Sequence, residues 1–121
     1  MDDKTALTTS NAGMRLIAMT MILNQGDFAR LKTYISDYYH AGILAETPVS
    51  MRLAEFKAVH RIAGKLRVKQ VIAADKHQVI AAIESERGGD FMAHISVEED
   101  YPHKILDYSL QAIGEIHTDA E

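Results

Sequence analysis

The chain of 121 residues contains no cysteine. This absence excludes disulfide bonds, thiolate metal sites and cysteine nucleophiles. The chain also lacks a hydrophobic run of the roughly 20 residues that a bilayer span requires. Its apolar run from Met14 to Leu23 is short, is interrupted by Arg15 and is followed by polar residues rather than a signal-peptide cleavage site. We therefore interpret this run as a helix and expect no membrane partner and a cytoplasmic location, with an exported parent protein as the alternative.

Positive charge is not concentrated anywhere in the sequence. The 13 basic and 17 acidic side chains give a net charge of -4, and the densest basic stretch, residues 61–69, contains no aromatic residue for base stacking. We therefore expect no nucleic-acid partner. Repeats and interdomain linkers are also missing, which predicts a single domain over 1–121 with an ordered core at about 10–113 and frayed polar ends at Met1–Thr9 and Gly114–Glu121.

Apolar spacing in the first half of the chain predicts three helices. The first is capped by Ser10 or Asn11, ends near Asn24 and has a buried face of Met14, Ile17, Ala18, Met21 and Ile22. Gly26 closes it, and Asp27 caps a second helix whose buried stripe is Phe28, Leu31, Ile35 and Tyr38. After a loop with Gly42, Thr47 and Pro48 open a third helix that buries Val49, Leu53, Phe56, His60 and Ala63 and stops at Gly64.

Beyond Gly64 the apolar period changes to two, which predicts four strands joined by short turns. We expect them at Leu66–Ala74, Gln78–Glu86, Phe91–Glu98 and His103–Ile113. Alternation assigns to the inner face Leu66, Val68, Ile72, Val79, Ala81, Ile83, Phe91, Ala93, Ile95, Val97, Leu106, Tyr108 and Leu110. The outer face is mostly charged but includes Ile80, Met92 and Ile105. The predicted fold class is α+β, with three N-terminal helices on a curved four-stranded antiparallel meander.

Several short motifs resemble a known family. The segment from Ile22 to Phe28 resembles the junction between the first two helices of nuclear transport factor 2-like, SnoaL-like and ketosteroid-isomerase-like domains. The order of the later features resembles an accessory domain found ahead of β-lactamase-type serine hydrolases: Asp37-Tyr38-Tyr39, Pro48 with Met51-Arg52-Leu53, Gly64 before Leu66, Arg87-Gly88-Gly89 and Pro102-His103-Lys104-Ile105. The resemblance covers about Met14 to Leu110 and implies a cystatin-like cone that hosts either enzymes or non-catalytic binders.

The chain departs from the catalytic members of that family. Where ketosteroid isomerases carry an oxyanion-donating tyrosine, the matching stretch is Met19, Thr20 and Met21, and the expected aspartate base has no clear match. No Ser-x-x-Lys motif occurs. These departures favour a non-catalytic or accessory domain over an enzyme.

The main functional hypothesis is a small hydrophobic ligand in an apolar pocket between the helices and the sheet. The expected lining residues are Tyr38, Tyr39, Phe56, His60, Phe91 and Tyr108. The alternative is a small isomerase, lyase or hydrolase in which His60 acts as general base and Tyr38 or Tyr108 as hydrogen-bond donor. A purely structural subunit with a filled core is a third hypothesis, and structural roles for His60 and the tyrosines are the commoner outcome in proteins.

The six histidines do not predict a metal site, because no two of them stand at the helical spacing of three or four residues. His94 and Glu98 share a strand face but lie roughly 13 Å apart at the usual rise. We therefore expect no metal and no cofactor. The mixed outer face of the sheet, with Ile80, Met92 and Ile105 among charged residues, predicts a homodimer contact.

Overall fold

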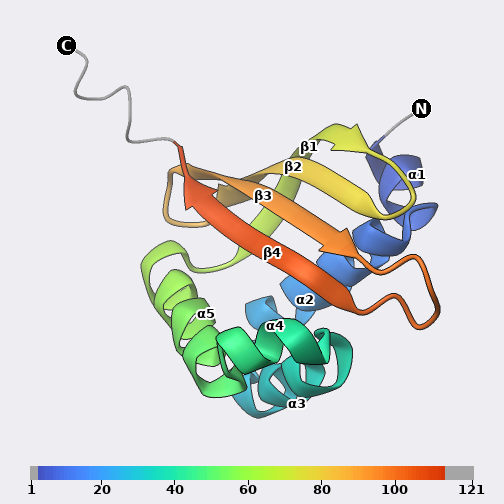
Figure 1. The fold of residues 1–121 in the computed structure, drawn as a ribbon. Helices are drawn as coiled ribbons and strands as arrows, with labels where there is room; N and C mark the ends of the chain where they lie inside the picture. Colours follow the sequence, from blue (N-terminus) through green and yellow to red (C-terminus); the bar gives the residue numbers. More distant parts are fainter. Residues whose placement is uncertain (1–2, 114–121) are drawn as a thin grey trace.

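The computed structural model describes residues 3–113, which form five helices and one four-stranded antiparallel sheet (Figure 1). The helices are α1 (Asp3–Thr8), α2 (Asn11–Gln25), α3 (Phe28–Tyr38), α4 (Ala41–Glu46) and α5 (Val49–Ala63). The strands are β1 (Leu66–Ala74), β2 (Gln78–Ser85), β3 (Asp90–Val97) and β4 (Ile105–Ala112), in the spatial order β1-β2-β3-β4. The predicted α+β class and antiparallel meander are confirmed. None of the helices in this range is long and apolar enough to cross a membrane.

Two of the five helices were not predicted. The segment expected to fray at the N-terminus contains α1, whose Leu7 is buried in the core, and the segment expected to be a loop contains α4. Each has six residues, too few to show a helical period, and isolated helices of this length are unstable without tertiary contacts. The predicted C-terminal end, Gly114–Glu121, lies outside the described residues.

The predicted helix boundaries are close to those observed. The Ser10 side chain accepts a hydrogen bond from the Gly13 N–H and caps α2, and Asp27 caps α3 through the Arg30 N–H. Gly26 ends α2 with φ of 70°, in the left-handed region where a side chain would cost energy. Helix α5 begins one residue later than predicted, because Pro48 rather than Thr47 is its N-cap.

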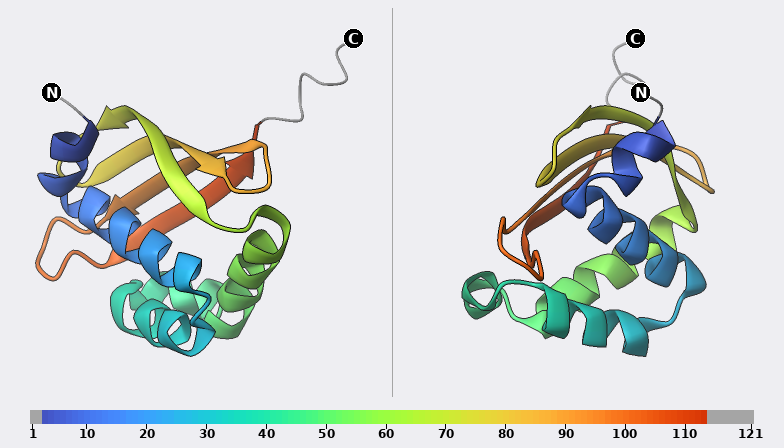
Figure 2. Two further views of the ribbon diagram at one scale, coloured as in Figure 1. Left: turned by 180° about the vertical axis from the view of Figure 1, so that it is seen from behind. Right: turned by 90° about the vertical axis from the view of Figure 1, so that its right-hand side faces the viewer.

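Helix α2 crosses the inner side of the sheet, and α3, α4 and α5 form a layer beyond it (Figure 2). The residues of α2 that are buried are Ala12, Gly13, Leu16, Met19, Ile22 and Leu23. The predicted buried face is therefore wrong for Met14 and Met21, which are 52% and 54% exposed. Apolar residues occur on two sides of this helix, and its spacing alone cannot say which side meets the sheet.

Three irregularities change the faces of the edge strands. The register of β1 against β2 shifts between Val68 and Gln70 and again between Val71 and Ala73, and β4 shifts opposite Ser96/Val97. At a bulge two residues oppose one, so the side chains beyond it change face relative to strict alternation until a second bulge restores the pattern. The predictions for three residues are therefore wrong: Ile72 and Leu106 are 52% and 40% exposed, whereas Ile105 is fully buried.

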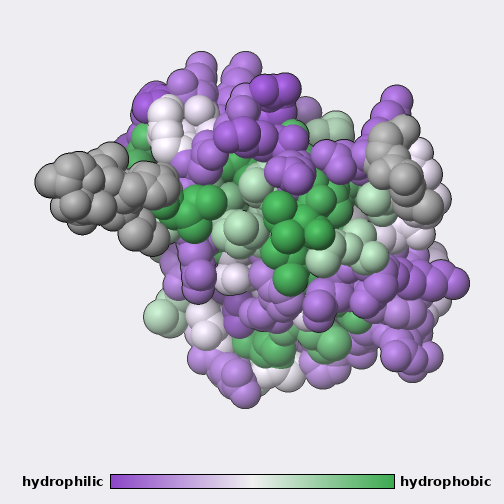
Figure 3. Space-filling view, turned by 90° about the horizontal axis from the view of Figure 1, so that it is seen from above, coloured by the Kyte–Doolittle hydropathy of each residue, from purple (hydrophilic) through white to green (hydrophobic). Residues whose placement is uncertain are grey.

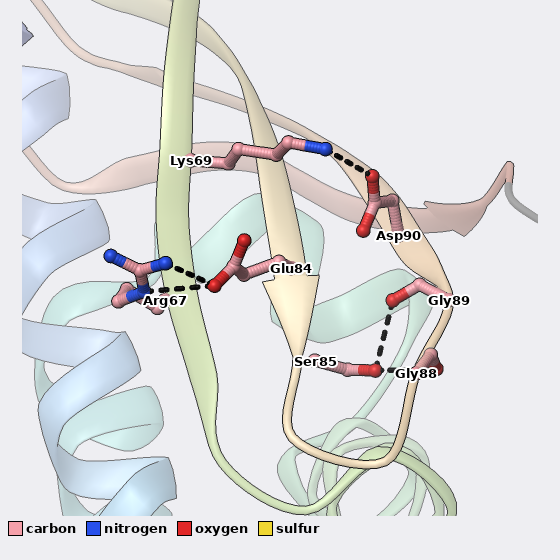
Figure 4. A network of polar contacts seen from close by, with 7 residues as sticks. All are labelled: Arg67, Lys69, Glu84, Ser85, Gly88, Gly89 and Asp90. Atoms are coloured by element: carbon pink, nitrogen blue, oxygen red, sulfur yellow. Dashed lines mark hydrogen bonds and ion pairs between the residues drawn. The ribbon is translucent and has the colours of Figure 1, made fainter.

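The outer face of the sheet carries an apolar patch surrounded by charged residues (Figure 3). Ala73, Ile80, Ala82 and Met92 are outer-face residues by their register, and Ile72 stands beside Ala73 at the second bulge of β1. Around them lie ion pairs between Arg67 and Glu84 and between Lys69 and Asp90, the latter at 3.0 Å, and a contact of 3.3 Å between His94 Nδ1 and Asp107 Oδ2. Figure 4 shows the first two pairs beside the β2–β3 turn, where Ser85 Oγ donates to the carbonyls of Gly88 and Gly89.

One side chain joins the end of α2 to the start of the sheet. The Asn24 amide accepts a hydrogen bond from the Leu66 N–H and donates one to the Leu66 carbonyl, both at 2.8 Å. The amide therefore takes the place of a neighbouring strand at the first residue of β1.

Candidate functional site

The space between the helical layer and the sheet opens into a cavity of about 360 Å³ between α5 and β4. Its walls are the rings of Phe56 and Tyr108, whose centroids are 5.6 Å apart, together with the aliphatic side chains of Val59 and Leu110. Glu55 and Ser109 supply the polar part of its lining. The cavity is thus a mainly apolar slot with one carboxylate, and none of the described residues that line it is basic.

The lining residues follow the helical spacing on α5 and the strand alternation on β4. Phe56 and Val59 are three residues apart on α5, so both face the same direction, and Phe56 is buried against the core. Tyr108 and Leu110 are two residues apart on β4 and lie on its inner face, paired with Ile95 and Ala93. The cavity therefore forms where the inner face of the edge strand meets one side of α5.

Two tyrosine hydroxyls lie behind the cavity in the interior. Burial raises the pKa of Tyr108 well above its ordinary value, while a hydrogen bond with Thr20 opposes the rise. Burial also raises the pKa of Tyr39, as does the nearby Tyr108, while the positive charge of Arg52 lowers it. Both phenols are therefore neutral at physiological pH and can serve as hydrogen-bonding groups but not as bases.

Arg52 contacts both the Tyr39 ring and the C-terminal end of α4. Its guanidinium donates to the carbonyls of Thr47 and Ile43 at 2.8 and 2.9 Å and lies 5.1 Å from the centroid of the Tyr39 ring. Both carbonyls belong to the C-terminal end of α4, where a cation is favourable. Arg52 is therefore a structural residue that closes the interior on this side.

The structure brings together some of the predicted pocket residues. Phe56 and Tyr108 line one cavity, and Tyr39 is buried behind it with 1% exposure. Tyr38 lies elsewhere, on the side of α3 that faces α2, with the Arg15 guanidinium 4.1 Å from its ring centroid. Phe91 pairs with Ile83 and Ala112 at the start of β3 and packs against the core without lining this cavity.

His60 also lies apart from Tyr38 and Tyr108. Its ring makes an edge-to-face contact with Phe28 at 5.5 Å, and its Nε2 is next to the α2–α3 turn at Gly26. Its Nδ1 is buried and has no hydrogen-bond partner among residues 3–113. His60 does not line the cavity of Phe56 and Tyr108, so the structure does not assemble the histidine–tyrosine pair that the enzyme hypothesis requires.

Four lining residues were not among the predicted pocket residues: Glu55, Val59, Ser109 and Leu110. Leu110 could have been found, because it has the same inner-face parity as Tyr108. Val59 could also have been found from its helical spacing to Phe56. The other two, Glu55 and Ser109, are polar, so the spacing of apolar residues could not indicate them.

Within residues 3–113, no group of three or more histidine, aspartate or glutamate side chains is arranged to hold a metal ion. The chemistry available at the cavity is that of apolar contact, aromatic stacking and an exposed carboxylate. Comparison of the chain with protein-family models, with curated proteins and with solved structures finds no match.

Proposed function

We propose that this chain is a non-catalytic small-molecule-binding domain whose ligand occupies the cavity between α5 and β4. The observation that carries the proposal is the slot lined by the Phe56 and Tyr108 rings, which has the size of a small ligand pocket and walls that are mostly apolar. The α+β architecture is compatible with the cone of nuclear transport factor 2-like domains, and membership of that class is part of the proposal. In such domains a pocket lies between the helices and the curved sheet.

The charge of the rim narrows the class of ligand. Among residues 3–113, Glu55 is the only acidic or basic side chain that lines the cavity, and the Tyr108 hydroxyl stays neutral. A flat aromatic molecule would stack against the ring faces that line the cavity. A positively charged substituent would lie near the Glu55 carboxylate, whereas an anionic one would be repelled. We therefore propose a neutral or cationic aromatic ligand.

Catalysis is not favoured at this cavity. A general base must reach the reacting proton with a pKa near the working pH. The phenols at and behind the cavity are held neutral, and His60 packs against Phe28 instead. The position of these groups supports binding over turnover.

The experiment compares three naphthalene derivatives of one size by calorimetry and by amide chemical shifts. We expect 1-(aminomethyl)naphthalene to bind about two- to fivefold more tightly than 1-naphthoate, because an exposed ion pair contributes about 0.2–1 kcal/mol. Neutral 2-acetylnaphthalene should fall between them. The shifted amides should cluster around residues 55–59 and 108–110.

A pair of variants on α5 tests the location. Val59→Trp should fill the slot and weaken aminomethylnaphthalene binding at least tenfold. Ile62→Trp, at a position that is 69% exposed, adds the same ring outside the cavity and should leave the affinity unchanged. Equal affinity in the two variants, or a preference for the naphthoate, would refute the proposed site.

The second part of the proposal is a homodimer formed through the outer face of the sheet. Its apolar patch, defined by Ile72, Ala73, Ile80, Ala82 and Met92, is bordered by ion pairs that place both signs of charge on the rim. A twofold axis brings the same patch of two copies together, so a rim with both signs can complement itself. This complementarity supports a second copy of the chain as the partner.

A further inference from the structure

The side of α2 that does not face the sheet forms a second hollow of the molecule. Together with α3 it encloses a groove of about 510 Å³. Its apolar lining consists of Met14, Ile17, Ala18, Met21 and Ile22, with Tyr34 and Tyr38 from α3. Its polar lining consists of Gln25, Arg30, Thr33 and Asp37, so both signs of charge border the groove. These α2 residues are the ones that the sequence predicted to be buried, and the groove is where two of them, Met14 and Met21, reach solvent instead.

Arg15 stands at one end of this groove. Its guanidinium lies 4.1 Å from the centroid of the Tyr38 ring, and its Nη1 donates to the Tyr34 hydroxyl at 3.2 Å. Its Nε donates to the His103 carbonyl at 3.2 Å, and its Nη2 donates to the Pro102 carbonyl. A cavity of about 350 Å³ lined by Arg15 shares Met14, Ala18, Tyr34 and Tyr38 with the groove, so the two hollows lie side by side.

The partners of Arg15 leave its charge uncompensated. All three acceptors are neutral, and among residues 3–113 no carboxylate lies within 4.0 Å of this half-buried guanidinium. A guanidinium has five N–H groups, so two remain without a partner in this part of the chain. The Tyr34 oxygen already accepts a hydrogen bond from Arg15, so its own O–H is free to donate. Three donors thus meet beside an apolar groove, which is the arrangement that binds a carboxylate.

We propose that this hollow binds a carboxylate with an apolar tail, of the class of medium-chain fatty acids. The carboxylate would accept hydrogen bonds from Arg15 and Tyr34, and the hydrocarbon chain would lie on Ala18 and Met21 along the groove. Methionine side chains adapt to flexible apolar ligands, which fits an alkyl chain better than a rigid ring. This site is separate from the slot between α5 and β4 and does not depend on the function proposed there.

Methyl-labelled methionine spectra of the full chain provide the test, with decanoate as the probe. The methyl signals of Met14 and Met21 should shift and saturate. Met51, 58% exposed on α5, and Met92, in the outer patch of the sheet, should not shift. Shortening the probe to octanoate removes two methylenes and should weaken binding about fifteenfold, since each buried methylene contributes about fourfold. Shifts of equal size at all four methionines would mean nonspecific adsorption and would overturn the proposal.

Two variants test separately the groove that would hold the hydrocarbon chain and the hydrogen bonds that would hold the carboxylate. Met21→Glu places a negative charge in the groove and should weaken decanoate binding more than tenfold, whereas Met51→Glu, at an equally exposed methionine, should not change it. Tyr34→Phe removes one hydroxyl and should weaken decanoate about fivefold while leaving decanol unchanged. Decanol binding as tightly as decanoate to the unmodified chain would overturn the role of Arg15, and no saturable binding at millimolar decanoate would overturn the site.

Discussion

Tyr39 and Tyr108 carry their hydroxyl groups into the interior, and this position couples their ionisation to folding. The pKa of each is raised above the ordinary value of 10.0, in both cases mainly by burial. A raised folded-state pKa means that the folded chain holds its proton more tightly than the unfolded chain. The resulting stability is complete below the unfolded value of about 10 and is lost as the pH rises beyond it.

The free energy of unfolding should therefore fall steeply above pH 10, by about 1.4 kcal/mol per pH unit for each buried tyrosine. Tyr39→Phe removes one of these contributions and should make the fall shallower. Tyr101→Phe is the control, because Tyr101 is 89% exposed and folding does not desolvate it. Urea unfolding measured between pH 8 and 11.5 gives the slope of the free energy of unfolding against pH. Identical slopes for the two variants would contradict the coupling of Tyr39 ionisation to folding.

At the scale of elements, the sequence predicts the long helices and all four strands, because each has a period that repeats over several turns or pairs. It fails where an element is too short for a period, as in α1 and α4. It also fails where two faces are apolar, as in α2, and where a bulge changes the alternation, as at Ile72 and Ile105. The wrong prediction for α2 also affects the candidate sites, because the face of α2 that was predicted to be buried is a wall of the α2–α3 groove.

The contact between α1 and α2 depends on a close approach at Gly13. A Cβ at that position would lie 2.3 Å from the Leu7 carbonyl oxygen and 2.8 Å from its Cα, and backbone atoms cannot move aside as a flexible side chain can. Gly13→Ala should therefore detach α1 and expose Leu7. The expected cost is about 1.5–3 kcal/mol, the value of burying one leucine side chain.

Hydrogen exchange should show protection lost in α1 and kept in β2 and β3. Leu7→Ala removes the same packing from the other side, so the double variant should cost less than the sum of the two single changes. Additive losses of unfolding free energy would show that Gly13 has a role other than allowing α1 to pack against α2.

At the scale of the whole molecule, the apolar patch on the outer face of the sheet predicts self-association. Ile72→Glu places a charge in the patch at a residue that is already 52% exposed, so the fold should be kept while the dimer is lost. Ile62→Glu makes the same change at an isoleucine of α5 that is 69% exposed and should leave the dimer intact. Light scattering at micromolar concentration measures the mass, and a monomer mass for the unmodified chain would refute the dimer.

The pairing of Asn24 with Leu66 has a consequence for how copies of this chain can assemble. A sheet grows sideways into a fibre only when an outermost strand offers free peptide groups to an incoming strand. At the start of β1 the Asn24 amide already occupies those groups, and at the start of β4 the His40 N–H occupies the carbonyl of Ile105. The two bulges of β1 further interrupt its outer margin. Both margins are thus partly sealed against lateral growth, which disfavours fibre formation through the strand edges.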